Sequence, residues 1–226
     1  RVLRQMSPAL RRLLASDILI RFCEQIPYAF VVIWCVKHAG VSEFSFGILR
    51  AIEMATAILI YIPVAYLADK TTKKPYVLAT FVFFTMFPVV LLYSHSMPML
   101  ILAFILRGLK EFGEPTRKAL IVDLCPEDRK AGMFGAYYLA RDCVVSLAAL
   151  LGAFLWDPSI ARRLAEALGI GAGLVEKSAW LFAPETNFMA AFIFGALGTL
   201  LFAIRGHDPE DRLPQAPDNG RVREGM

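Results

Sequence analysis

The fold is decided by one apolar stretch near the N-terminus, Leu14-Ala-Ser-Asp-Ile-Leu-Ile-Arg-Phe-Cys-Glu-Gln-Ile-Pro-Tyr-Ala-Phe-Val-Val-Ile-Trp-Cys-Val36. It is long enough to cross a bilayer, which takes about 20 apolar residues, yet it holds Arg21 and Glu24. A charge at the centre of a membrane helix costs roughly 2.5–3.5 kcal/mol on insertion scales. Such residues persist when they face a protein interior or a wet cavity. The stretch therefore predicts a membrane helix whose polar face turns toward other helices.

The rest of the chain repeats this pattern. Of its 226 residues, 57% are hydrophobic, whereas a soluble domain is about 45–50% apolar. The excess lies in blocks of nearly spanning length, which predict an all-α polytopic membrane bundle of six transmembrane helices. The expected helices cover about 13–36, 45–68, 76–93, 97–122, 132–156 and 187–204.

Basic residues are distributed unevenly over the segments between these helices. If the helices alternate in direction, the entry segment 1–12, the links 69–75 and 125–130 and the tail 205–226 fall on one side and carry most of the Lys and Arg residues. The other side has few outside the long link 157–186. The positive-inside rule then places both termini in the cytoplasm. We expect a multi-pass protein of the cell (inner) membrane.

The link 157–186 is extracytoplasmic in this arrangement and contains an amphipathic segment, Ser159-Ile-Ala-Arg-Arg-Leu-Ala-Glu-Ala-Leu168. Two positions stay open for this segment: it lies in the membrane interface, or it caps the extracytoplasmic face. A structural role is favoured for the link as a whole. The tail 205–226 is rich in Pro, Asp and Arg, so we expect a disordered cytoplasmic tail.

Short similarities divide the six helices into two groups of three. In the first helix, Arg21-Phe-Cys-Glu24-Gln-Ile-Pro27 resembles Arg107-Gly-Leu-Lys-Glu111-Phe-Gly-Glu-Pro115 in the fourth. Each has a base, an acid one turn later and then a proline. The second and fifth helices resemble each other more weakly. Because each group has an odd number of spans, the sequence predicts two inverted three-helix repeats.

Thirteen charged residues fall inside the expected membrane spans, and the cost of ten of them already decides their direction. Facing lipid, they would cost roughly 25–35 kcal/mol in total, whereas net stabilities are nearer 5–15 kcal/mol. These charges must therefore turn inward, or toward water near the membrane surface. The ten residues are Arg21, Glu24, Arg50, Glu53, Arg107, Lys110, Glu111, Glu114, Arg141 and Asp142.

Helical spacing sorts charged and polar residues onto faces. At 100° per residue, Asp17, Arg21, Glu24 and Tyr28 share one face of the first helix. We expect a second shared face on helix four. Its residues are Arg107, Glu111, Glu114 and Lys118.

Two interpretations of these charges stay open. In the structural one, bases and acids one turn apart neutralise each other and lock helices together; it is favoured for Arg50 with Glu53 and for Arg141 with Asp142. In the functional one, carboxylates exchange protons while Arg or Lys hold an anionic or zwitterionic substrate. The functional interpretation is favoured for the charged residues that lie near the prolines and glycines that interrupt the helices. The candidate substrate or coupling-ion residues are Arg21, Glu24, Arg107, Lys110, Glu111 and Glu114.

Motifs typical of enzymes are missing from the sequence. There is no Gly-rich phosphate loop, no H-E-x-x-H, no Gly-x-Ser-x-Gly elbow and no Cys–His metal set. The four cysteines match no zinc or redox spacing. We therefore expect no catalytic activity, metal, cofactor or nucleic-acid partner. An intramembrane enzyme that uses the carboxylates is the least favoured alternative.

The link after the second helix reads Ala65-Tyr-Leu-Ala-Asp69-Lys70-Thr-Thr72-Lys73-Lys74. It resembles the cytoplasmic signature of the major facilitator superfamily, Gly-x-x-x-Asp-Arg/Lys-x-Gly-Arg/Lys-Arg/Lys, with Ala65 and Thr72 in place of the glycines. The matching residues are Asp69, Lys70, Lys73 and Lys74. In addition, Pro126-Glu-Asp-Arg-Lys-Ala-Gly132 is similar to the family's linker between the fourth and fifth helices.

This resemblance implies one half, most simply the C-terminal half, of a twelve-helix transporter with alternating access about a central site. The first and fourth helices of each half would line the cavity. The implied activity is secondary active transport, as a symporter or antiporter, of a small polar or charged solute with a proton or cation as coupling ion. Its partners would be the lipid bilayer and the other six-helix half, or a second copy.

The resemblance also implies a role for the signature. It would act as a cytoplasmic latch in which Asp69 pairs with basic or helix N-terminal groups on neighbouring helices. The alternative function is a non-transporting membrane sensor, scaffold or assembly module that retains the fold.

Overall fold

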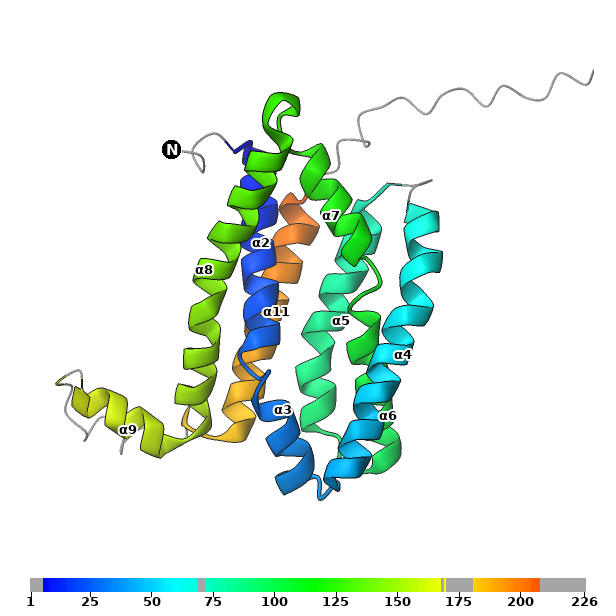
Figure 1. Ribbon diagram of the computed structural model, residues 1–226. Coiled ribbons are helices and arrows are strands. Elements are labelled where there is room, and N and C mark those ends of the chain that lie inside the picture. Colours follow the sequence, from blue (N-terminus) through cyan, green and yellow to red (C-terminus); the bar gives the residue numbers. More distant parts are fainter. Residues whose placement is uncertain (1–5, 69–71, 168, 170–180, 208–226) are drawn as a thin grey trace, which may run out of the picture.

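Every regular element in the described part of the chain is helical, as the sequence predicts (Figure 1). The computed structural model describes residues 6–68, 72–167, 169 and 181–207. The signature residues Asp69 and Lys70 and the tail beyond residue 207 lie outside this part. The elements are α2 (Pro8–Gln25), α3 (Phe30–Ile33), the π-helix η1 (Trp34–His38), α4 (Glu43–Ala68), α5 (Lys74–Leu92), α6 (Met97–Leu109), α7 (Glu114–Asp123), the 3₁₀-helix η2 (Glu127–Arg129), α8 (Lys130–Trp156), α9 (Pro158–Ala167) and α11 (Pro184–Arg205).

Among the described residues, five helical segments are long and apolar enough to cross a membrane. They are Pro8–His38, Glu43–Val64, Lys74–Leu92, Glu127–Trp156 and Pro184–Arg205. The segment expected as the fourth helix, 97–122, is divided into α6 and α7, and each piece is too short to span by itself. The two pieces nevertheless follow each other from one end of the bundle to the other (Figure 1). Together they supply the crossing that the sequence predicts.

Proline marks the helix starts. Pro8 occupies the first turn of α2, and Ser7 caps that helix by accepting a hydrogen bond from the Leu10 N–H at 3.2 Å. Proline also stands in the first turn of α5, α6, α7 and α11. Its missing N–H is not needed there and its φ is already helical. Pro63 and Pro88, in contrast, lie inside α4 and α5 without ending them.

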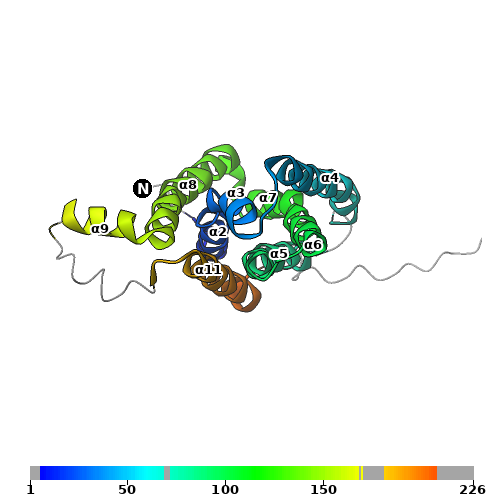
Figure 2. The same cartoon turned by 90° about the horizontal axis from the view of Figure 1, so that it is seen from below.

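The centre of the bundle is formed by α2–α3 and α6–α7. Figure 2 shows α4 and α8 at the two flanks, with α5 and α11 along one side. α11 packs against both α2 and α5, α4 packs against α6, and α8 packs against α2. The approach of α11 requires a small residue, because a Cβ at Gly195 would lie 2.8 Å from the Sγ of Cys23 and 2.8 Å from the Oγ1 of Thr85.

The two central segments are the first helices of the two repeats, and both are broken. The first break covers residues 26–29 and contains Pro27, which has no N–H to continue the α2 ladder. The second covers residues 110–113 and ends at Gly113. α2 and α6 enter from opposite ends of the bundle (Figure 1). This is the inverted relationship that an odd number of spans per repeat requires.

Apolar clusters fill the two ends of the bundle. One includes Leu13, Phe81 and Leu120, which are fully or almost fully buried. The other includes Val31 and Phe104 near the opposite end. The charged residues of α2 and α6–α7 lie between and beside these clusters, so the fold places them in the interior that the sequence predicts.

Candidate functional site

The break at 110–113 positions the charges of the fourth crossing. The Gly113 N–H donates to the Oγ1 of Thr80 on α5 at 2.5 Å. A Cβ at Gly113 would lie 2.4 Å from the Tyr76 carbonyl oxygen, so this close approach requires glycine. Because of this break, the side chains of α7 point in directions that differ from those that a straight continuation of α6 would give.

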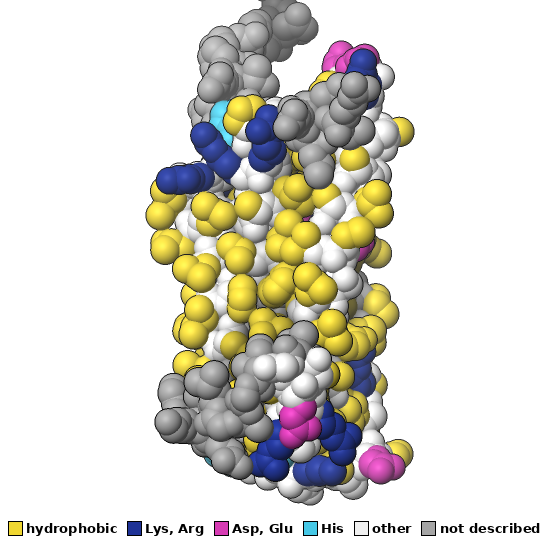
Figure 3. Space-filling view, turned by 90° about the vertical axis from the view of Figure 1, so that its left-hand side faces the viewer, with side chains coloured by type: hydrophobic (Ala, Val, Ile, Leu, Met, Phe, Trp, Pro, Cys, Tyr) yellow, Lys and Arg dark blue, Asp and Glu magenta, His cyan; other side chains and the backbone are white. Residues whose placement is uncertain are grey.

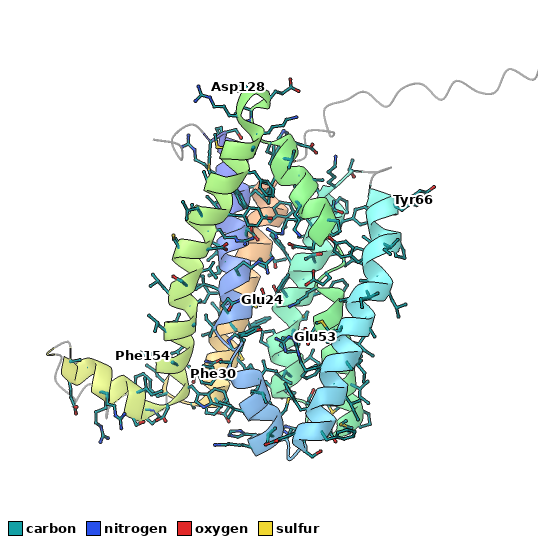
Figure 4. The ribbon with its side chains drawn as sticks, viewed as in Figure 1. Glu24, Phe30, Glu53, Tyr66, Asp128 and Phe154 are labelled. Atoms are coloured by element: carbon teal, nitrogen blue, oxygen red, sulfur yellow. The ribbon has the colours of Figure 1, made fainter. Side chains whose placement is uncertain are left out.

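Glu24 of α2 stands between two bases at mid-height of the bundle (Figure 4). Its Oε2 lies 2.7 Å from the Nη1 of Arg21, one turn earlier on the same helix. Its Oε1 accepts a hydrogen bond from the Nζ of Lys110 at 2.7 Å. Because Lys110 belongs to the second break, this carboxylate joins the two broken helices.

Glu114 makes the next link. Arg117, one turn later on α7, donates to its two oxygens from Nε at 3.0 Å and Nη2 at 2.6 Å. This is the two-point geometry of the stronger Arg–carboxylate pairs. The Nη2 of Arg21 lies 3.4 Å from the same carboxylate, so Arg21 connects Glu24 with Glu114.

Asp17, midway along α2, makes the next link. Its Oδ2 lies 2.5 Å from the Nη1 of Arg117 and 3.4 Å from the Nη1 of Arg141 on α8. It also accepts a hydrogen bond from the Tyr137 hydroxyl at 3.1 Å. Arg141 in turn pairs with Asp142 at 2.8 Å.

These contacts form one continuous series, which we term the charged chain. It alternates in sign and crosses repeatedly between α2 and α6–α7. It has four bases and three carboxylates, so it carries an excess of one positive charge. Two largely exposed residues, Lys118 beside Glu114 and Asp142 beside Arg141, add one charge of each sign and leave this excess unchanged. Its members, in order, are Lys110, Glu24, Arg21, Glu114, Arg117, Asp17 and Arg141.

A second ionic group lies on the α4 side. Glu53 pairs with Arg50 one turn earlier, and its Oε1 lies 3.4 Å from the Nε of Arg107. The Arg107 guanidinium carbon lies 5.1 Å from the centre of the Phe87 ring and 5.9 Å from that of Tyr28. This group also has one more base than acid.

A pocket joins the charged chain to the second group. Its volume of about 10 Å³ is enough for roughly one water molecule. In this conformation the site is therefore closed around the side chains themselves. The pocket is lined by Cys23, Glu24, Val31, Phe83, Phe84, Phe87, Arg107 and Lys110.

Glu111 faces a different surface. It lies in a groove against α4 with a volume of about 370 Å³. Within the part of the chain that the structure describes, no ion pair reaches its carboxylate, which sets it apart from Glu24 and Glu114. The remaining lining residues are apolar or aromatic: Met54, Ala57, Ile58, Tyr61 and Ile62.

The structure brings most of the candidate residues together. Arg21, Glu24, Lys110 and Glu114 belong to the charged chain, and Arg107 reaches the same pocket. Glu111 does not join them. The pairs Arg50–Glu53 and Arg141–Asp142 both form.

One expectation is wrong. The four residues Arg107, Glu111, Glu114 and Lys118 do not share one face, because the break at 110–113 divides them into two pairs. Arg107 and Glu111 turn to α4, whereas Glu114 turns to α2 and lies 3.7 Å from Lys118, one turn later on α7.

Sequence reasoning also missed three members of the ionic network. These members are Arg117 and Tyr137, to which the sequence assigns no role, and Asp17, which it places on a face of the first helix without one. The available signals were the one-turn spacing of Glu114 and Arg117, and Asp17 standing one turn before Arg21.

At the end of the bundle that carries the signature, Lys73 contacts α7. Its Nζ lies 3.0 Å from the Oδ2 of Asp123, the last residue of that helix. This contact ties the start of α5 to the end of α7. Asp69, for which the latch role is expected, lies outside the described residues.

The comparisons with known proteins agree with this architecture. The family model described as Major Facilitator Superfamily matches residues 13–223, which is nearly the whole chain. The chain therefore belongs to the major facilitator superfamily, a family of membrane transporters. A search of curated proteins found no match.

Proposed function

We propose that the chain moves a small anionic or zwitterionic solute across the membrane by alternating access, coupled to a proton or cation. The observation that carries this proposal is the charged chain, which lies inside the bundle along two broken helices and has more bases than acids. A solute with a carboxylate or phosphate group would complete its charge balance.

A purely structural role explains this arrangement less well. Removing charges from water is costly, and replacing a buried ion pair by well-packed apolar residues is often neutral or stabilising. Stability alone therefore gives little reason to keep seven charged residues in one interior series. A transporter whose interior side chains must exchange their contacts with one another for contacts with a solute has a direct reason to keep these charges.

Solute binding then requires the central helices to separate. The pocket beside Glu24 and Lys110 has room for about one water molecule. The breaks at Pro27 and Gly113 supply points at which α2–α3 and α6–α7 can bend. Opening would exchange the Glu24–Lys110 contact for a contact between Lys110 and the solute.

Glu111 is the coupling carboxylate in this proposal. Glu24 and Glu114 each contact two or more bases, so protein groups already balance their charge. Glu111 lies against apolar residues of α4, where burial penalises a charged carboxylate. Of these three carboxylates, Glu111 is therefore the one whose free energy falls most when it binds a proton or a cation.

The working unit would include a second six-helix body, either another half of the same protein or a second copy. Large apolar side chains on the flanking helices remain exposed, including Ile58 at 69% on α4 and Leu150 at 69% on α8. These flanks border the central segments α2–α3 and α6–α7 (Figure 2). The orientation that fits the basic links places both termini in the cytoplasm of the cell membrane.

Flux measurements in proteoliposomes test the proposal. Solute uptake driven by a proton gradient is expected, and Glu111→Gln should abolish driven uptake while leaving solute exchange intact. Glu43→Gln, at the first residue of α4, is the matched control. Full driven uptake in Glu111→Gln would remove this residue from coupling. Solute binding with no flux in the wild type would favour the non-transporting alternative.

A further inference from the structure

α9 leaves the bundle sideways. Figure 1 shows it pointing away from α8 at the end opposite the α7–α8 link. The turn is built at Asp157, whose Oδ1 accepts a hydrogen bond from the Ser159 N–H at 2.7 Å. This hydrogen bond lowers the pKa of Asp157, so the carboxylate that fixes the turn stays ionised.

One face of α9 is held by the bundle. Ala161 and Ala165, one turn apart, are buried in a cluster with Phe182, and Phe154 of α8 packs against it. The small alanine side chains allow the helix to lie close to α8. Packing therefore accounts for this face of α9 and leaves its other sides for contacts outside the bundle.

The other faces differ in character. At 100° per residue, Ile160 and Ala167 lie on one side of the alanine face. Arg163 and Glu166 lie opposite the alanine face, with Arg163 about 60° from Ile160, and Arg162 lies on the other side of the alanine face from Ile160. Ile160 is 39% exposed, and both arginines are exposed. The helix thus has one exposed apolar flank at Ile160 and an exposed polar side that carries Arg162, Glu166 and, next to the apolar flank, Arg163.

The level of α9 corresponds to a membrane boundary. Figure 3 shows a band of hydrophobic side chains across this face of the molecule, with Lys and Arg side chains gathered at both ends. α9 belongs to the lower end. Trp156, the last residue of α8, stacks on Phe30 at 4.5 Å between ring centres. Tryptophan is typical of the layer where hydrocarbon gives way to headgroups.

We infer that α9 is an interfacial helix that binds the lipid surface, with Ile160 among the acyl chains and Arg162 and Arg163 on lipid phosphate groups. An apolar flank beside a polar side that carries arginines, lying across the direction of the spans, is the arrangement of helices that lie in the membrane plane. Guanidinium groups match phosphate oxygens in geometry and charge. Between the two positions that the sequence leaves open, the structure favours the membrane interface.

Spin labels on α9 test its depth. We would place single cysteines at Ile160 and, as the matched polar control, at Glu166, with exposed Cys143 replaced by Ser. In reconstituted vesicles, the label at 160 should collide with oxygen more than with a water-soluble nickel complex. The label at 166 should do the reverse. Equal nickel access at both positions, or a label at 160 shielded from both reagents, would overturn the inference.

A second variant tests the arginines. Arg162→Gln with Arg163→Gln, in vesicles that contain phosphatidylglycerol, should raise nickel access at position 160. The equilibrium between α9 bound to the membrane surface and α9 detached from it should shift toward the detached form by roughly 30-fold, because two basic residues are lost at an anionic surface. Lys37→Gln, on a neighbouring segment, is the control and should leave position 160 unchanged. If nickel access of the label at position 160 is unchanged in the double arginine variant, with helical content preserved, these residues do not bind lipid phosphate.

Discussion

Asp17 on α2 and Arg117 on α7 form an ion pair in which each side chain is only 1% exposed, with the Oδ2 of Asp17 2.5 Å from the Nη1 of Arg117. The pair lies deeper than any other contact of the charged chain. Through Tyr137 and Arg141, the same carboxylate also holds α8. A single acid midway along α2 therefore connects α2 with α7 and α8, and so joins the two repeats.

Arg117→Met should destabilise the protein strongly. It leaves Asp17 with Arg141 at 3.4 Å and Glu114 with Arg21 at 3.4 Å, both poorer contacts than the ones lost. Removing one partner of a buried pair typically costs about 3–5 kcal/mol. Thermal unfolding in detergent should show a large fall in Tm.

The control for this prediction is the double variant Asp17→Asn with Arg117→Met. Because it removes both charges of the pair, it should recover part of the loss. A single variant as stable as the wild type would show that the pair does not hold α2 against α7.

Lys110→Gln tests the solute-binding role of the charged chain. A charge-assisted hydrogen bond contributes about 1.5–3 kcal/mol, so the KM for an anionic solute should rise by roughly 10- to 150-fold. Lys118→Gln is a matched control, since its side chain is 47% exposed and lies 3.7 Å from Glu114. Equal KM values for the two variants would remove Lys110 from the binding site.

Much of the fold could be predicted from the sequence. The inward direction of the charges follows from the cost of placing Arg21 or Glu24 against lipid. The break positions follow from the chemistry of Pro27 and Gly113. These are local properties that hold whichever helices become neighbours.

The partners of the charges could not be predicted in the same way. Helical spacing assigns Arg50 to Glu53 because both lie on one helix, but it cannot show that Arg107 also reaches Glu53 from α6. The contact between Asp17 and Arg117 depends on how α7 turns after its break. A change of direction at residues 110–113 alters every face that follows, so a continuous helical wheel wrongly places Arg107 and Glu111 on the face of Glu114 and Lys118.

Gly113→Ala should lower the stability of the protein, because it disturbs the close packing at the second break. The new Cβ would meet the Tyr76 carbonyl at 2.4 Å and the Thr80 Oγ1 at 2.7 Å, and forced overpacking typically costs about 1–3 kcal/mol. Gly135→Ala, on α8, meets nothing within 4 Å and serves as the control. A lower Tm for Gly113→Ala alone is expected, whereas similar Tm values for the two variants would show that α7 can shift without loss.

The contact between Lys73 and Asp123 should influence the transport cycle more than stability. Asp123 is 40% exposed, and exposed ion pairs contribute only about 0–1 kcal/mol, so Lys73→Glu or Asp123→Lys should change Tm little. Each single variant should nevertheless change the flux, because α5 and α7 belong to different repeats and their ends must separate if the signature side of the bundle opens.

The charge-swapped double variant, with Glu at 73 and Lys at 123, decides between a latch and a simple surface contact. It restores attraction between the two helix ends with the signs exchanged, so its flux should return toward the wild-type value. Flux that stays low in the double variant, with Tm unchanged, would mean that Lys73 acts through some other partner. Recovery would assign to Lys73 and Asp123 the latch that the sequence places at Asp69.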